Sequence, residues 1–158
     1  ARGQRYFASA VGEVNVVEKM KQENAVIGGE GNGGVIYPEL HYGRDALVGI
    51  ALFLSLLAKS GKTCSALRAS YPNYEISKNK MELTPEMNVD LILEKMAKKY
   101  ADCEVLTTDG VKIMFKDEWV HLRKSNTEPI IRIYSESRDM AAANALATKI
   151  MNEIKQLL

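Results

Sequence analysis

The chain has 158 residues, 46% of them hydrophobic and 26% charged, with 21 Lys and Arg against 20 Asp and Glu. This length and balance fit one ordinary or two small globular domains with enough apolar side chains for a core. A net charge of +1 argues against a general polyanion binder, and the longest apolar run, residues 46–58, is too short to span a bilayer. We therefore expect neither nucleic acid nor a membrane as a partner.

The cysteine pattern excludes two further classes. Cys64 and Cys103 share no metal-ligand spacing with each other or with the two histidines, so neither a zinc site nor a disulfide framework is expected. We interpret both as buried or half-buried thiols of a cytoplasmic protein. The chain begins at Ala1 without an initiator Met or a signal peptide, which is the pattern of a fragment.

The first half of the chain predicts helices alternating with short strands. From the N-terminus the predicted elements are a β-compatible stretch at 6–11, a helix at 14–23, a short buried strand at 25–27, a second short strand at 35–37, and a long helix from 44 or 45 to 59. We expect Asn24 to break the first helix, Asp45 to favour the start of the second, and Gly61 to end it. The second helix is apolar enough to be a buried core helix.

The second half predicts an α+β domain. Turn-forming residues dominate 60–80, with a short helix expected at 65–70. The elements that follow are an amphipathic helix at 85–100, strands at 110–115, 119–123 and 130–135, and a helix at 139–157. Asp109-Gly110 is a hairpin signal. This order predicts a small antiparallel sheet covered by two helices.

Five glycines crowd the seven residues from Gly28 to Gly34. They match G-x-G-x-x-G by letter, but the segment that follows, residues 35–38, is strand-like and ends in proline, whereas the dinucleotide fingerprint needs a helix. A plain turn between two strands is the simpler alternative. So many glycines indicate a backbone that approaches a ligand, and the acceptors and donor of Glu30 and Asn32 suit a hydroxyl-rich sugar.

A second polar loop, residues 123–129, reads Arg-Lys-Ser-Asn-Thr-Glu-Pro and lies between two predicted strands. Its hydroxyl, amide and backbone N–H donors are typical of an anion-binding nest. Arg123 and Arg132 bracket it with guanidinium groups that suit a phosphate. An ordinary turn flanked by solvated arginines is the alternative that these residues leave open.

The two loops together resemble those of the α-D-phosphohexomutase superfamily, whose members interconvert 1-phospho and 6-phospho sugars. Residues 29–33 resemble the G-E-x-S-G sugar-binding loop of its third domain, with Asn32 in place of the usual Ser and Gly34 where His is common. Residues 123–132 resemble the R-x-S-N-T-E-P-x-x-R phosphate-binding loop of its fourth domain.

This resemblance implies a fold in two parts. Residues 1–72 would be the C-terminal part of the α/β third domain, 73–84 a linker or hinge with the first strand, and 85–158 the α+β fourth domain with its TATA-box-binding-protein-like fold. The implied sugar-binding residues are Gly29, Glu30, Asn32 and Gly33. The implied phosphate-binding residues are Arg123, Ser125, Asn126, Thr127 and Arg132. Glu13 lies where the family has a substrate-side turn.

The resemblance also implies that the chemistry lies elsewhere. The family's phosphoserine loop, T-A-S-H-N, and magnesium loop, D-G-D-x-D-R, do not occur in this sequence. We expect no catalytic or metal-binding residue here, and expect Mg²⁺ and the N-terminal domains of the same chain to complete an enzyme of the phosphoglucomutase or phosphomannomutase type, acting on hexose phosphates. The alternatives are a phosphoglucosamine mutase, a non-catalytic phosphosugar-binding module and a nucleotide-binding protein.

Overall fold

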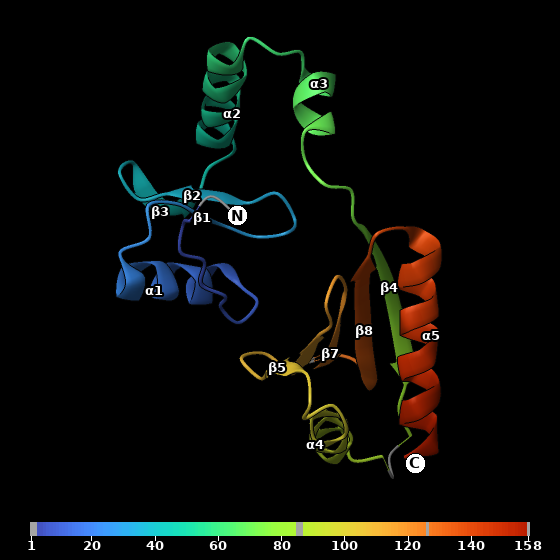
Figure 1. The fold of residues 1–158 in the computed structure, drawn as a ribbon. Coiled ribbons are helices and arrows are strands. Elements are labelled where there is room, and N and C mark those ends of the chain that lie inside the picture. The colour runs from blue at the N-terminus through green and yellow to red at the C-terminus, as the bar shows by residue number, and fades with distance from the viewer. Residues whose placement is uncertain (1–2, 85–86, 126, 158) are drawn as a thin grey trace. The chain divides into compact units, whose positions relative to one another are not determined.

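The computed structural model describes residues 3–84, 87–125 and 127–157. The chain divides into two compact units, Ala1–Pro72 and Asn73–Leu158, each with its own sheet (Figure 1). The predicted fold class, a mixture of α/β and α+β elements, is confirmed.

The first unit is built on a three-stranded antiparallel sheet in the order β1-β2-β3. Its elements in chain order are α1 (Glu13–Glu23), β1 (Gly28–Gly29), β2 (Val35–Tyr37), β3 (His41–Arg44), α2 (Ala46–Ser60) and α3 (Cys64–Ala69). The helix ends follow the predicted signals. Asn24 ends α1 in the left-handed conformation (φ 49°), the Asp45 carboxylate accepts a hydrogen bond from the Val48 N–H, and Gly61 ends α2 (φ 63°).

Two expectations for this unit are wrong, and one strand was missed. The predicted buried strand at 25–27 is absent, because pairing with β2 begins only at Gly28, opposite Ile36, and Val26 is 79% exposed. Residues 6–11 form no strand. Strand β3 has the sequence His-Tyr-Gly-Arg, which carries no strong strand signal, and it was not predicted.

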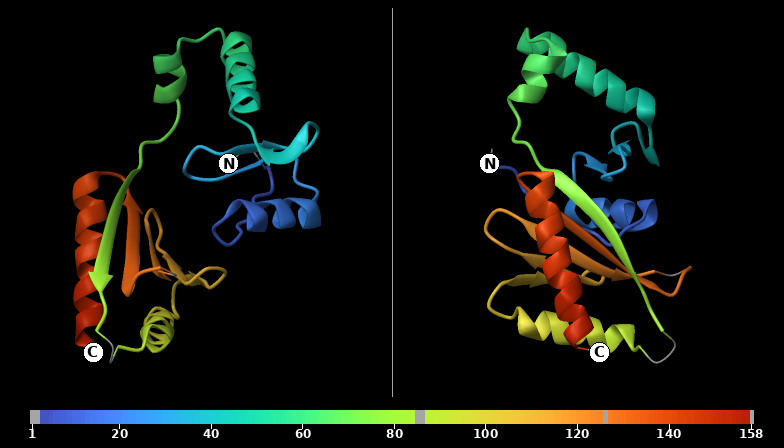
Figure 2. Two further views of the ribbon diagram at one scale, coloured as in Figure 1. Left: turned by 180° about the vertical axis from the view of Figure 1, so that it is seen from behind. Right: turned by 90° about the vertical axis from the view of Figure 1, so that its right-hand side faces the viewer.

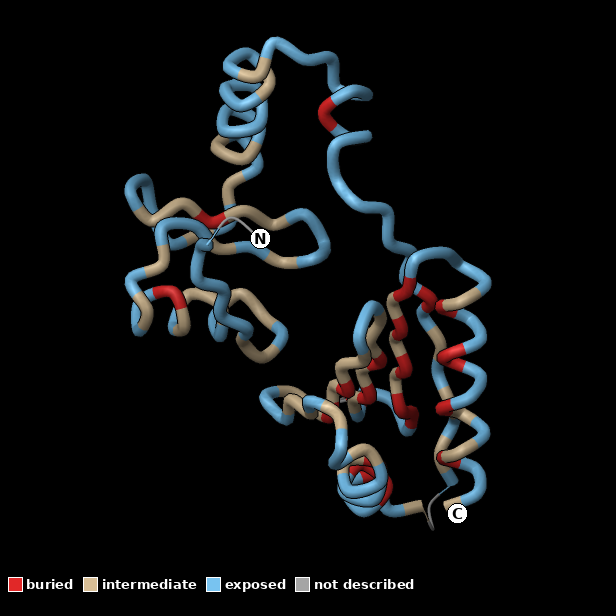
Figure 3. The backbone as a smooth tube through the Cα atoms, viewed as in Figure 1, coloured by how far each residue is buried: buried red, intermediate tan, exposed pale blue. Residues whose placement is uncertain are grey.

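Helix α2 is apolar but exposed, which corrects the prediction of a buried helix. None of its residues is buried, and Leu47 is 78% exposed (Figure 3). Its main packing partner is β2, where Gly49 lies against Val35. An apolar composition predicts that a helix packs against other parts of a protein on several sides, but it does not identify those parts. Cys64, at the start of α3, is likewise exposed rather than buried, whereas Cys103 is half-buried.

The second unit is a five-stranded antiparallel sheet in the order β4-β8-β7-β6-β5 (Figure 2). Its elements are β4 (Glu75–Glu82), α4 (Val89–Lys99), β5 (Glu104–Leu106), β6 (Val111–Met114), β7 (Trp119–Lys124), β8 (Ile130–Ser137) and α5 (Met140–Gln156). Both helices pack on one face of the sheet, as the sequence predicts. The buried core between sheet and helices consists of Val89, Ile92, Leu93, Met96, Val111, Ile113, Val120, Leu122, Ile131, Ile133, Leu146, Ile150 and Ile154.

Two features of this sheet extend the prediction. Strand β4 pairs with β8 along its whole length, from Glu75 opposite Ser137 to Glu82 opposite Ile130, so most of the segment 73–84 is strand. Strand β5 has three residues and was not predicted. The predicted start of α4 at 85–86 lies outside the described residues. Among the residues that the structure describes, no helix is long and apolar enough to cross a membrane.

Candidate functional site

The glycine-rich loop is a tight hairpin between β1 and β2. The Glu30 N–H donates to the Gly34 carbonyl at 3.0 Å, and the Gly33 N–H donates to the Glu30 carbonyl at 3.0 Å. A Cβ at Gly29 would lie 2.5 Å from the Gly34 carbonyl oxygen, and Gly33 has a φ of 96°. The turn itself therefore requires glycine at these two positions.

Glu30 is the buried polar group of this loop. Its side chain is 15% exposed, and Oε1 is buried and accepts no hydrogen bond from any described residue. Asn32 is exposed, and its Oδ1 accepts a hydrogen bond from the Gly34 N–H at 3.1 Å. The side-chain amide oxygen of Asn32 thus stabilises the turn, and Glu30 is the buried carboxylate of the loop.

An arginine from β3 joins this hairpin to the start of α1. The Arg44 backbone N–H and Nε donate to the two carboxylate oxygens of Glu13, at 3.0 and 2.9 Å. The backbone hydrogen bond from Arg44, and then its guanidinium charge, hold the pKa of Glu13 below its usual range. Arg44 Nη1 lies 3.6 Å from Glu30 Oε1. Sequence reasoning named Glu13 and Glu30 but missed Arg44, because the contact joins residues 31 positions apart.

The second loop connects β7 to β8 and places two arginines opposite each other. Arg123 and Arg132 are cross-strand partners, with side chains 25% and 34% exposed. Ser125 is buried, its N–H donates to the Ile130 carbonyl at 3.1 Å, and its Oγ lies 3.5 Å from the N–H of Thr127. The predicted residue Asn126 lies outside the described residues. The other four predicted phosphate-binding residues are brought together here.

The register extends this pair into a row of three cations. Lys80 on β4 is opposite Arg132 on β8, which is opposite Arg123 on β7. Directly paired residues of antiparallel strands project from the same face, and like charges placed so are destabilising. Asp109 Oδ2 lies 3.1 Å from Arg123 Nη1, and Glu128 Oε2 lies 3.8 Å from Arg132 Nη2. Three cations against two carboxylates leave a net positive row, which an anion would neutralise.

Lys80 is the member of this row that sequence reasoning missed. Lys78 and Lys80 alternate along β4, which indicates one exposed face of a strand, but only the register shows which residue lies opposite Arg132. Lys124 follows Arg123 directly and therefore projects from the other face. There its ammonium group lies 3.6 Å from Asp90 of α4.

The β5–β6 hairpin holds Asp109 beside Arg123. His121 Nε2 and the Asp109 carbonyl oxygen are 2.5 Å apart. Gly110 has a φ of 71°, and a Cβ there would lie 2.2 Å from the Leu122 carbonyl oxygen, so only glycine allows the hairpin to approach β7 so closely. The orientation of Arg123 therefore depends on a turn some dozen residues earlier in the chain.

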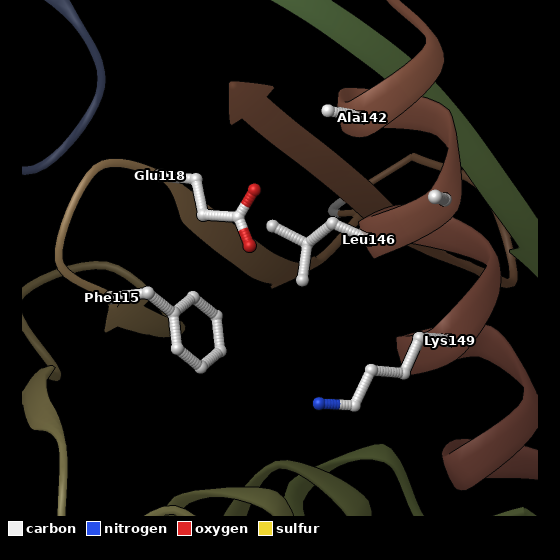
Figure 4. Close-up of a pocket in the computed structure, with 6 residues that line it drawn as sticks. Phe115, Glu118, Ala142, Leu146 and Lys149 are labelled. Carbon is white, nitrogen blue, oxygen red and sulfur yellow. The ribbon is translucent and has the colours of Figure 1, made fainter. Parts of the chain in front are cut away.

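A shallow pocket lies between α5 and the β6–β7 turn, where Phe115, Glu118, Leu146 and Lys149 approach one another (Figure 4). Its polar side chains contact other side chains of the same unit. The Glu118 carboxylate accepts a hydrogen bond from the Ser137 hydroxyl at 2.8 Å, and Lys149 Nζ lies 6.0 Å from the centre of the Phe115 ring. The pocket contains no residue of either loop.

Comparison with known proteins assigns both units. The model of phosphoglucomutase/phosphomannomutase alpha/beta/alpha domain III matches residues 1–74, and that of the phosphoglucomutase/phosphomannomutase C-terminal domain matches residues 80–153. The chain belongs to the phosphoglucomutase/phosphomannomutase family. The resemblance to this family is therefore confirmed.

Relatives of the family cover nearly the whole chain. A phosphoglucosamine/phosphogalactosamine mutase of Sulfurisphaera tokodaii is 41% identical over 94% of this chain and 32% of its own length. A phosphoglucomutase/phosphomannomutase of Thermococcus kodakarensis is 38% identical over 96% of this chain and 34% of its own length. The chain thus spans about a third of the length of these relatives.

A solved structure gives the same fold. A phosphoglucomutase/phosphomannomutase family protein of Burkholderia thailandensis aligns with a TM-score of 0.70 and 26% identity, over 92% of this chain and 31% of its own. The N-acetylphosphoglucosamine mutase of Aspergillus fumigatus, at 13% identity and a TM-score of 0.55, supports the fold alone.

Proposed function

We propose that this chain is the C-terminal sugar- and phosphate-binding portion of a phosphohexomutase that interconverts hexose 1-phosphate and hexose 6-phosphate. The observation that carries the proposal is the direct pairing of Arg123 with Arg132, extended by Lys80 on the next strand. A sheet that places like charges opposite one another stores repulsion that a dianionic phosphate relieves. The names of the relatives supply the class of reaction.

We propose a separate role for each loop. Arg123 and Arg132 would donate to the phosphate that is not being transferred, with the Ser125 and Thr127 hydroxyls beside them. The Glu30 carboxylate, whose Oε1 is buried beside Arg44, would accept a hydrogen bond from a sugar hydroxyl. Such contacts position the substrate, and positioning provides a large share of the rate enhancement in phosphoryl transfer.

The transfer itself would need groups from N-terminal domains. We propose that these supply a phosphoserine, which passes its phosphoryl group to the sugar and regains one from the bisphosphorylated intermediate. Mg²⁺ would stabilise the charge of the transferring phosphoryl group. Among the described residues, no group of three or more His, Cys, Asp or Glu side chains could hold that ion.

A hexosamine phosphate is the second candidate substrate. Glu13 and Glu30 flank the single cation Arg44, so these three side chains carry one net negative charge. An ammonium group on the sugar would neutralise it, and the Sulfurisphaera tokodaii relative is a phosphoglucosamine/phosphogalactosamine mutase.

Titration of the ¹⁵N-labelled chain tests the proposal. We expect glucose 6-phosphate, glucosamine 6-phosphate and inorganic phosphate to shift the backbone amide signals of residues 123–132, and unphosphorylated glucose to leave them unchanged. We also expect no mutase turnover by this chain alone. Turnover by the isolated chain, or a loop that responds to none of the phosphates, would overturn the proposal.

The coding sequence upstream of Ala1 distinguishes the enzyme from a non-catalytic phosphosugar-binding module. A mutase requires a T-A-S-H-N segment and a D-G-D-x-D-R segment in the same reading frame. A reading frame that lacks both would favour the binding module.

A further inference from the structure

The side chain of Arg44 lies across the glycine-rich hairpin. A Cβ at Gly34 would lie 2.9 Å from Arg44 Cδ and 3.4 Å from Arg44 Cγ. The aliphatic part of Arg44 thus occupies the space that any side chain at position 34 would need. A side chain at position 34 would therefore require Arg44 to move.

Glu13 fixes the direction of the guanidinium group. Its two carboxylate oxygens accept from the Arg44 backbone N–H and from Nε, so one carboxylate binds the residue at both ends. Charge-assisted hydrogen bonds of this kind are about twice as strong as neutral ones. Because Nε is bound to Glu13, the Nη1 atom of the same planar group is held toward Glu30.

Arg44 offsets the charge of Glu30 without donating a hydrogen bond to its carboxylate. A buried carboxylate oxygen that accepts no hydrogen bond is unfavourable unless a cation lies near it. The distance of 3.6 Å from Arg44 Nη1 to Glu30 Oε1 is within ion-pair range but beyond a hydrogen bond. The ion pair therefore compensates the burial of Oε1 and orients the Glu30 carboxylate.

We infer that Arg44 is a positioning and specificity-determining residue of the sugar loop, which orients Glu30 and sets the preference between neutral and cationic sugars. The inference rests on the proposed function. With Arg44 present, the three side chains carry one net negative charge, and without it they would carry two. Loss of Arg44 would then favour an amino sugar, whereas loss of the Glu13 charge would favour a neutral one.

The test uses the 158-residue chain and two probes, glucose 6-phosphate and glucosamine 6-phosphate, whose dissociation constants are measured by NMR titration. In Arg44→Gln we expect glucose 6-phosphate to bind about three- to tenfold more weakly. We expect the preference for glucosamine 6-phosphate over glucose 6-phosphate to rise by a similar factor. In Glu13→Gln the preference moves in the opposite direction.

Two controls separate this role from a structural one. Arg44→Lys keeps the positive charge but cannot reproduce the hydrogen bond from Nε to Glu13. We therefore expect its preference between the two sugars to be close to that of the wild type, while its affinity for glucose 6-phosphate stays reduced. Inorganic phosphate, which is assigned to the loop of Arg123 and Arg132, is expected to bind every variant equally. If Arg44→Gln does not fold, the opposite shift in Glu13→Gln carries the test.

The possible failures are distinguishable. A wild-type chain that responds to no phosphorylated sugar overturns the proposed function, and this inference with it. A wild-type chain that binds both sugars, with an unchanged preference in Arg44→Gln and Glu13→Gln, overturns only the role of Arg44. A parallel loss of affinity for both sugars would assign Arg44 to the support of the hairpin alone.

Discussion

Replacing Arg123 by Ala should weaken phosphate binding far more than replacing its neighbour Lys124. The two residues are adjacent cations of β7 that project from opposite faces of the sheet. Arg123 lies opposite Arg132 on the exposed face, whereas Lys124 lies 3.6 Å from Asp90 on the helix side. Both substitutions remove one positive charge, so Lys124→Ala is the matched control for long-range electrostatics.

The expected magnitude follows from the contacts that each side chain makes. A hydrogen bond between charged groups contributes about 1.5–3 kcal/mol, so the loss of the Arg123 guanidinium should weaken phosphate binding by about 10- to 150-fold. Lys124 is 55% exposed and its partner Asp90 is 78% exposed. An exposed charge on the far face is screened by salt, and its removal should change the affinity by less than about twofold.

Arg123→Ala should remain folded. It removes the contact with Asp109, which stabilises the sheet, and also the repulsion from Arg132, which destabilises it. Each effect amounts to about 1 kcal/mol or less, and the two oppose each other. Dissociation constants for inorganic phosphate and glucose 6-phosphate, measured at one fixed ionic strength, are the assay. Equal losses in Arg123→Ala and Lys124→Ala would show that net charge, rather than a guanidinium fork, explains the site.

Three further predictions test other parts of the structure. Gly110→Ala should cost about 2 kcal/mol or more in unfolding free energy, because it adds a steric clash to a strained φ, whereas Gly61→Ala has the strain without the clash and should cost about 1 kcal/mol. Burial, and then the neighbouring Glu153, raise the pKa of Tyr100 above its usual 10.0. The stabilisation from its phenol is therefore complete below pH 10 and is lost as the pH rises further, so the stability difference between wild type and Tyr100→Phe should shrink in alkaline urea titrations. Lys80→Ala should weaken phosphate binding about two- to fivefold, and Lys78→Ala, one row along β4, should have a smaller effect.

Each of these expectations has a clear contrary result. Equal destabilisation by the two glycine substitutions would mean that the hairpin does not press against β7. A constant difference between wild type and Tyr100→Phe above pH 10 would contradict the shifted pKa. Equal losses of phosphate affinity in Lys78→Ala and Lys80→Ala would show that the position of Lys80 opposite Arg132 does not matter for binding.

The features predicted correctly from the sequence are those that nearby residues determine. Asn24, Asp45 and Gly61 mark helix ends because their own backbone and side chains satisfy the free groups of the adjacent turn. The three main strands of the second unit follow from alternation along each strand. The two loops were found because their residue types match a family pattern, and that pattern needs no knowledge of the fold.

The features that the sequence could not predict depend on residues far apart in the chain. The pairing of Lys80 with Arg132 is fixed by the register of two strands, and a shift of one residue would place Lys80 on the other face. The contact between Arg44 and Glu13 depends on how β3 lies beside α1. The exposure of Leu47 depends on which elements pack against α2, and the composition of the helix does not predict these.

A crystal structure of the chain with bound hexose 6-phosphate tests the central claim most directly. We expect the phosphate to lie within hydrogen-bonding distance of the guanidinium groups of both Arg123 and Arg132. A phosphate bound elsewhere, with these arginines still paired only to Asp109 and Glu128, would contradict the assignment of this loop as the phosphate site.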